Sequence, residues 1–274
     1  MDFHNQHIII TGGSSGIGRA TACLLARRGA HISIIARRQE LLDETLAELE
    51  TLRENPAQRF QIHSADLADW EQAQQAIAAL TAGDFPTDIL INSAGFSHPG
   101  YFEELDLEIF RRTMDVDFFG TLHPIKAALP AMMERRSGHI VNISSGAGFL
   151  GLFGYTAYCA AKFAVRGFSD TLRQEMKPYG IHVSAVFPPD VDTPMLHYEN
   201  QLKPMETRAL TGTAKTLPAD QVAQTLVRGI ERRQAYILPG FEVRLYFLLT
   251  NGFIGLVSRY ADSIIAKAFK ERKA

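Results

Sequence analysis

Cysteine and excess charge are both scarce in this sequence. The 274 residues include two cysteines, Cys23 and Cys159, and neither lies in a Cys-x-x-Cys or other metal-ligand pattern. The sequence therefore disfavours a disulfide scaffold and indicates a reduced, cytoplasmic setting. The formal net charge is -2, which creates no strong field toward nucleic acid. Because no two histidines have metal-ligand spacing either, we expect neither a metal site nor a nucleic-acid partner.

Long hydrophobic runs are missing as well. Residues 1–13 lack a basic region followed by an apolar one, so no signal peptide is predicted. The apolar stretch Leu245–Val257 is interrupted at Asn251 and is too short to span a bilayer. Arginines flank this stretch and basic residues follow it, which suits a segment lying on the cytoplasmic face of a membrane. The same composition suits a helix packed in the core or in an oligomer, and both interpretations stay open.

Short apolar segments alternate with helical patterns along most of the chain. Strands are predicted at His7–Thr11, His31–Ala36, Phe60–Ser64, Asp88–Asn92, His139–Ser144, His182–Phe187 and Ala235–Leu238. Helices are predicted at Arg19–Gly29, Gln39–Arg53, Trp70–Leu80, Leu107–Arg135, Ala157–Lys177 and Gln221–Arg232. Strands that are apolar on both faces belong in a parallel sheet with helices on each side.

Strict alternation of strands and helices predicts an α/β fold with a doubly wound parallel sheet of Rossmann type. We see no linker or internal repeat, so residues 1–240 are predicted to form one domain. Within it, residues 190–215 are expected to form a mobile lid over the substrate. Residues 241–274 are expected to form an apolar and basic helical tail.

A glycine-rich segment joins the first predicted strand directly to a helix. Glycines there allow a tight turn and a close approach of backbone to a pyrophosphate, and the helix N-terminus favours anions. The alternative is a plain turn, but the strand–turn–helix context favours a dinucleotide site. The predicted contacts from this segment are Gly12, Ser14, Ser15, Gly16, Ile17 and Gly18.

The end of the second strand predicts which dinucleotide binds. An NAD site places an acidic residue there for the ribose 2′-hydroxyl. This chain instead has Arg37 and Arg38, whose guanidinium groups suit a 2′-phosphate, so NADPH is the predicted cofactor. The alternative is that both arginines are merely solvated. Further predicted contacts follow the third and fourth strands: Asp66, Leu67, Asn92, Ala94 and Gly95.

Tyr158 and Lys162 are separated by one helical turn, and Ser145 precedes them. A free tyrosine has a pKa of about 10, and a neighbouring ammonium is expected to lower it. Tyr158 could then protonate a carbonyl oxygen while a hydride reaches the carbonyl carbon, with Ser145 bonded to the same oxygen. A tyrosine–lysine pair alone is common, so its weight comes from the motifs that surround it.

These motifs together resemble the short-chain dehydrogenase/reductase family over residues 5–240. The resemblance rests on the glycine segment, Asp66, the motif 92–95, and the order of Ser145, Tyr158 and Lys162. It implies that Tyr158 and Lys162 also contact the cofactor, with Lys162 on the nicotinamide ribose. It further implies cofactor contacts from Val191 and Thr193, and a homo-oligomer, either a dimer or a tetramer.

One residue departs from the family pattern. Where the family usually has an asparagine that holds a water for the proton relay, this chain has Asp117. A carboxylate could still hold a water, and it would add negative charge beside Lys162. We therefore count Asp117 with Ser145, Tyr158 and Lys162 as a catalytic candidate. A tolerated substitution with no consequence is the alternative.

A narrower resemblance points to the substrate. Residues 151–158 and 188–194 are similar to the corresponding segments of 3-ketodihydrosphingosine reductases, as are the shorter matches 134–136, 199–200, 203–204 and 206–207. That implies NADPH-dependent reduction of a lipid ketone, 3-ketodihydrosphingosine, to dihydrosphingosine in sphingolipid synthesis. The alternatives are a reductase of another carbonyl compound, such as a 3-oxoacyl thioester, steroid or retinoid. A non-catalytic cofactor-binding protein and a membrane-associated lipid-binding protein also stay open.

Overall fold

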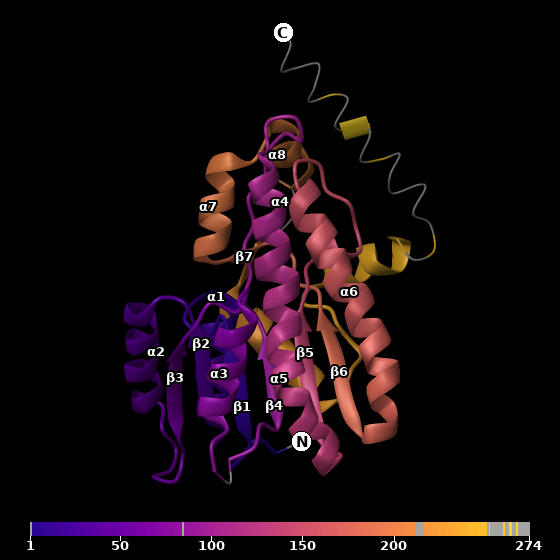
Figure 1. The fold of residues 1–274 in the computed structure, drawn as a ribbon. Helices are drawn as coiled ribbons and strands as arrows, with labels where there is room; N and C mark the ends of the chain where they lie inside the picture. The colour runs from indigo at the N-terminus through magenta and orange to yellow at the C-terminus, as the bar shows by residue number, and fades with distance from the viewer. Residues whose placement is uncertain are drawn as a thin grey trace.

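All strands of the main sheet run parallel, as the apolar segments predict (Figure 1). The computed structural model describes residues 2–83, 85–211 and 216–250, with isolated positions beyond residue 250. Within these residues the sheet has the strand order β3-β2-β1-β4-β5-β6-β9. Its strands are β1 (His7–Thr11), β2 (His31–Ala36), β3 (Phe60–Ser64), β4 (Ile89–Asn92), β5 (Gly138–Ile143), β6 (Ile181–Val186) and β9 (Tyr236–Ile237).

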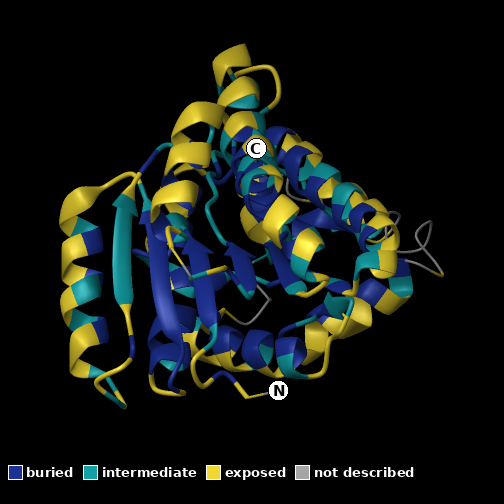
Figure 2. Ribbon diagram, turned by 60° about the horizontal axis from the view of Figure 1, so that its bottom comes forward, coloured by how far each residue is buried: buried dark blue, intermediate teal, exposed yellow. Residues whose placement is uncertain are grey.

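Helices cover both faces of the sheet, as Figure 2 shows by the buried strands and the exposed outer sides of the helices. The helices are α1 (Gly16–Ala26), α2 (Gln39–Thr51), α3 (Trp70–Leu80), α4 (Leu107–Thr113), α5 (Gly120–Arg135), α6 (Thr156–Met176), α7 (Pro194–Leu202), α8 (Met205–Thr211) and α9 (Ala219–Glu231). Successive residues of β1 point to opposite faces of the sheet: Ile8 and Ile10 pack with α1, α2 and α9, whereas Ile9 packs with α3, α5 and α6. This two-sided burial is why the strands are apolar throughout.

The strand order reverses between β1 and β4. From β1 the chain builds outward through β2 and β3, and from β4 it builds the other way through β5 and β6. Parallel sheets leave a crevice beyond the carboxyl ends of the strands at such a reversal, and ligands bind there. The helices α7 and α8 stand beyond the strands at the top of Figure 1, and a short pair, β7 (Val191–Asp192) and β8 (Leu217–Pro218), connects them to the sheet side.

Of the six predicted helices, only Trp70–Leu80 has the predicted bounds at both ends, and two of the other five differ in an informative way. The first begins at Gly16 rather than at Arg19, because the glycine segment itself forms the opening turn. The predicted helix Leu107–Arg135 is divided by a π-helical turn, η1 (Met114–Phe119), into α4 and α5. π-Turns often occur at functional sites, and this one contains Asp117.

The predicted lid and tail are only partly described. Residues 190–215 include α7 and α8, and positions 212–215 lie outside the described residues. Residues 241–250 are helical, and Val243 and Phe247 pack against Phe149 and Phe187 of the main domain. Most of the predicted tail beyond residue 250 lies outside the described residues. Within the described part, no helix is both long and apolar enough to cross a membrane.

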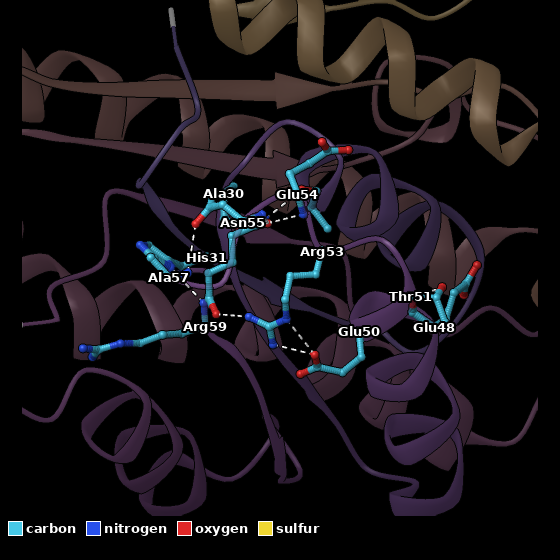
Figure 3. A network of polar contacts seen from close by, with 12 residues as sticks. Ala30, His31, Glu48, Glu50, Thr51, Arg53, Glu54, Asn55, Ala57 and Arg59 are labelled. Atoms are coloured by element: carbon cyan, nitrogen blue, oxygen red, sulfur yellow. Dashed lines mark hydrogen bonds and ion pairs between the residues drawn. The ribbon is translucent and has the colours of Figure 1, made fainter.

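The amino end of the sheet carries a network of polar contacts at the start of β2 and β3 (Figure 3). Arg53 bonds to Glu50 and donates to the carbonyl oxygen of Gln58, and its guanidinium lies 4.8 Å from the ring centre of Phe60. The side chain of Gln58 in turn donates to the carbonyl oxygen of Ala30. These bonds hold the turn that leads into β3.

Candidate active site

A cleft at the carboxyl ends of the strands brings together most of the residues predicted from the sequence. Its walls come from the loops after β1, β2, β3, β4 and β5, from the start of α6 and from the segment around α7. The predicted residues that line it are Gly12, Ser14, Ser15, Gly16, Ile17, Arg37, Arg38, Asp66, Leu67, Ala94, Gly95, Ser145, Tyr158, Lys162, Val191 and Thr193. Gly18, Asn92 and Asp117 do not line it.

The glycine segment fits a close approach of backbone to a bound dinucleotide. Gly12 has φ +63°, and a Cβ there would lie 2.7 Å from the backbone nitrogen of Ala94. Gly16, the first residue of α1, has φ +52° and faces Thr193, whose Cγ2 would be 2.9 Å from an added Cβ. The first amides of a helix have no partner within it, so this turn presents donors to an anion at the edge of the cleft. The residues present therefore fit a pyrophosphate.

Gly18 and Asn92 lie behind the cleft wall. A Cβ on Gly18 would come within 2.4 Å of the carbonyl oxygen of Gly12, so its lack of a side chain lets α1 pack against the glycine turn. Asn92 is buried, and its Nδ2 donates to Oδ1 of Asn142 on the neighbouring strand at 2.9 Å. In this structure both residues shape the cleft from behind, where direct cofactor contacts were predicted.

Arg37 and Arg38 are exposed at the mouth of the cleft, just after β2. The nearest acidic residue in sequence is Glu40, in the first turn of α2. A 2′-phosphate placed at the end of β2 would meet two guanidinium groups, which bind phosphate well. Asp66 and Leu67, which follow β3, line the same side.

Tyr158 lies in the first turn of α6 and is half-buried. Burial raises its pKa well above the usual value, and the carboxylates of Asp117 and Glu199 raise it further, while a hydrogen bond with Ser145 opposes them. The net shift is therefore upward, opposite to the lowering expected from Lys162 alone, and burial is its largest cause.

Lys162 forms a buried ion pair with Asp117. The distance from Nζ to Oδ1 is 2.8 Å, and the two side chains are 4% and 0% exposed. Lys162 also donates to the carbonyl oxygen of Ile143 at 3.2 Å, and its Nζ lies 5.4 Å from the ring centre of Tyr158. Burial raises the pKa of Asp117, and the lysine opposes that rise. Asp117 thus affects Tyr158 in two ways: its own charge raises the pKa of the phenol, and its ion pair fixes the position of Lys162.

The π-turn explains how a carboxylate reaches this interior position. It buries Asp117 while Asp115, two residues earlier, stays exposed. The backbone amide of Phe96, in the loop after β4, donates to Oδ1 of Asp117 at 3.3 Å. Oδ2 is buried and makes no hydrogen bond within the described residues.

Several residues of the cleft were not among the predicted site residues. Tyr155 is buried, and its hydroxyl donates to Oε2 of Glu199 at 2.9 Å. Asp190, after β6, bonds to Lys203 at 3.1 Å. These pairs join α6 and the loop after β6 to the region of α7. They are distant in sequence, so no local pattern could have paired them.

The arrangement can transfer a proton beside a bound dinucleotide. A phenol with a raised pKa stays protonated at neutral pH, and it shares one cleft with the glycine turn and with Ser145. The side chains required to polarise and protonate a carbonyl oxygen are therefore grouped where a reduced nicotinamide could lie.

Comparison with known proteins agrees with this geometry. Residues 6–203 match the family model described as short chain dehydrogenase. A short-chain dehydrogenase from Sphingobium yanoikuyae, solved in complex with NADPH, superimposes with a TM-score of 0.78 at 28% sequence identity. The match covers 92% of this chain and 95% of that one.

The curated relatives share more of the sequence. The chain is 41% identical over 223 residues to the 3-ketodihydrosphingosine reductase of Bos taurus, covering 81% of this chain and 67% of the relative. It is 38% identical over 276 residues to the 3-ketodihydrosphingosine reductase of Dictyostelium discoideum, covering 95% of this chain and 82% of the relative.

Proposed function

The chain belongs to the short-chain dehydrogenase family, and from that membership we propose that it reduces 3-ketodihydrosphingosine to dihydrosphingosine with NADPH. The observation that carries the reaction class is that the glycine turn and Tyr158 line one and the same cleft. The substrate follows from the relatives, which carry this activity in their names at 38–41% identity. Arginines in place of an acid after β2 support NADPH over NADH.

When bound, NADPH supplies a hydride for the carbonyl carbon of the substrate. The chain's own side chains act on the carbonyl oxygen. Ser145 donates a hydrogen bond to that oxygen, and Tyr158 transfers its hydroxyl proton to it. The phenol is protonated at neutral pH, as any tyrosine with a pKa of about 10 or above is, so its proton is available to the carbonyl oxygen. Lys162, oriented by Asp117, lies next to the phenolate and can return a proton to it.

Around this centre, we propose that residues 1–240 are the catalytic domain and that 190–215 cover the substrate. Met195, Leu196 and Glu199 of α7 all line the cleft, which supports a substrate-covering role. A dimer or tetramer is a family expectation, and the molar mass in solution tests it.

We also propose peripheral contact with the cytoplasmic face of a membrane through the helical residues 241–250. Phe241 and Leu248 are 79% and 70% exposed there, which suits insertion into lipid. Flotation with anionic vesicles tests the contact, and protein that stays at the bottom of the gradient refutes it.

Turnover assays test the proposed reaction. The purified chain should oxidise NADPH in the presence of 3-ketodihydrosphingosine, at a higher kcat/KM than with NADH. The same assay with a 3-oxoacyl thioester of equal chain length separates the proposed substrate from the nearest alternative. Faster turnover of the thioester would refute the substrate assignment, and no NADPH oxidation with any ketone would refute the enzyme.

A further inference from the structure

A buried carboxylate lines the cleft beside Tyr158 and takes no part in the proton transfer described above. It belongs to Glu199 of α7, which is 7% exposed. We propose that Glu199 binds the ammonium group of the substrate, so that the enzyme selects ketones with an amino group on the adjacent carbon. This inference rests on the proposed function and names the part of the substrate that the site recognises.

The charged groups around Glu199 include too few cations to balance its carboxylate. Asp190 lies in the same wall of the cleft, and its carboxylate is 3.1 Å from the ammonium of Lys203. The groups that bond to Glu199 are neutral: the hydroxyl of Tyr155 lies at 2.9 Å, and the hydroxyl of Ser97 also lowers the pKa of the carboxyl group. Within this described group, two carboxylates therefore share one ammonium. A carboxylate with little exposure to water attracts a cation strongly, so an ammonium ligand completes the balance.

The raised pKa of Glu199 agrees with this shortage of positive charge. Burial raises the pKa of its carboxyl group, and the charge of Asp190 adds to the rise, whereas the hydroxyls of Ser97 and Tyr155 and the charge of Lys203 oppose it. A bound ammonium would favour the ionised carboxylate. Binding of an amino ketone is then coupled to the charge of this side chain, whereas binding of an uncharged ketone is not.

The position of Glu199 relative to the reacting oxygen fits an amino ketone. In the proposed substrate the nitrogen is attached to the carbon next to the carbonyl carbon, so it lies close to the oxygen that Tyr158 protonates. The ring centres of Tyr155 and Tyr158 are 5.9 Å apart, and the hydroxyl of Tyr155 points to Glu199. The charge of Glu199 is also felt at Tyr158. One substrate can therefore reach Tyr158 with its oxygen and Glu199 with its nitrogen.

A second glutamate provides a matched control. Glu206 of α8 is fully buried, and its Oε2 accepts a hydrogen bond from the hydroxyl of Tyr101 at 2.9 Å. It thus repeats the tyrosine–glutamate contact of Glu199 but does not line the cleft. Replacing it measures what the loss of a buried carboxylate does to the fold alone.

The experiment compares two ketones of equal chain length, 3-ketodihydrosphingosine and its analogue without the amino group. For each ketone kcat and KM are measured with NADPH in the wild type, Glu199→Gln and Glu206→Gln. Glutamine keeps an oxygen that can accept the hydrogen bond from the hydroxyl of Tyr155, but it carries no charge. We expect Glu199→Gln to lower kcat/KM about 10- to 100-fold for the amino ketone, mainly through KM. For the analogue we expect a change within about twofold.

In the wild type, kcat/KM should be at least about tenfold higher for the amino ketone than for its analogue. This comparison does not depend on how the variants fold. Glu206→Gln should change both ketones by the same factor. Equal losses on both ketones in Glu199→Gln, or no preference in the wild type, would overturn the inference and leave the proposed reaction standing. A wild type that turns over neither ketone overturns the proposed function, and the inference with it.

Discussion

The two ends of the parallel sheet each hold an arginine or lysine paired with a carboxylate, but the pairs differ in burial. At the amino end, the side chains of Arg53 and Glu50 are 28% and 46% exposed. At the carboxyl end, those of Lys162 and Asp117 are 4% and 0% exposed. Water screens the first pair, so it contributes little more than local order. The second pair is not screened, and its charge therefore reaches the neighbouring phenol.

Buried charge is concentrated at the carboxyl end of the sheet, where the cleft lies. The polar contacts at the amino end fasten a turn, whereas the buried charges at the carboxyl end surround Tyr158 and the cleft. A buried ion pair is a poor source of stability, because both groups lose their hydration. Its presence beside Tyr158, the proposed proton donor, indicates a role in positioning and electrostatics.

The largest expected effect lies at the carboxyl end. Tyr158→Phe removes the proposed proton donor and should lower kcat about 100- to 10,000-fold. The melting temperature should stay near that of the wild type. Tyr179→Phe, beyond the other end of α6, is the matched control and should keep the wild-type kcat. Full turnover by Tyr158→Phe would refute the assignment of the proton donor.

Asp117→Asn should shift the pH dependence of reduction. The carboxylate of Asp117 raises the pKa of Tyr158, and its removal also leaves the charge of Lys162 unbalanced. Both changes lower that pKa. Since reduction requires the protonated phenol, the loss of kcat at high pH should begin about one pH unit lower than in the wild type.

The same variant should also be less stable. Asparagine keeps an acceptor oxygen for Lys162, so the loss should remain below the about 3–5 kcal/mol of a broken buried pair. Denaturant unfolding measures it. Asp115→Asn, on the exposed side of the same π-turn, is the control and should alter neither the pH profile nor stability. An unshifted profile in Asp117→Asn would show that the carboxylate only replaces the usual asparagine.

Arg38→Ala should weaken NADPH binding and leave NADH binding nearly unchanged. A lost charged hydrogen bond to the 2′-phosphate corresponds to about a tenfold rise in the KM for NADPH. Arg27→Ala, an exposed change just after α1, should affect neither KM. Equal rises for both cofactors in Arg38→Ala would mean that this arginine does not read the 2′-phosphate.

The smallest effect is expected at the amino end. Arg53→Ala removes an exposed ion pair and a contact over the ring of Phe60, and should lower the free energy of unfolding by about 1 kcal/mol. Its kcat and pH profile should match those of the wild type. A changed pH profile would show that the ion pair at the amino end also affects Tyr158.

The strands and the glycine turn were accessible from the sequence because their signals are local. Ile8, Ile9 and Ile10 are apolar on both faces, which predicted a strand covered on each side, and the structure confirms it. Gly12 needs a positive φ and a close neighbour, and its place after that strand indicated both. The division of the helix Leu107–Arg135 was missed, since a π-turn leaves no clear pattern in the sequence.

The sequence by itself determined the parallel α/β fold and the placement of Tyr158 and Lys162 one helical turn apart, because spacing along the chain sets which residues share a face. Only the tertiary structure decided that Asp117 holds Lys162, that Tyr155 meets Glu199, and that the pKa of Tyr158 is raised and not lowered. Burial and charge at a site depend on groups that are distant in sequence, and only folding brings those groups together.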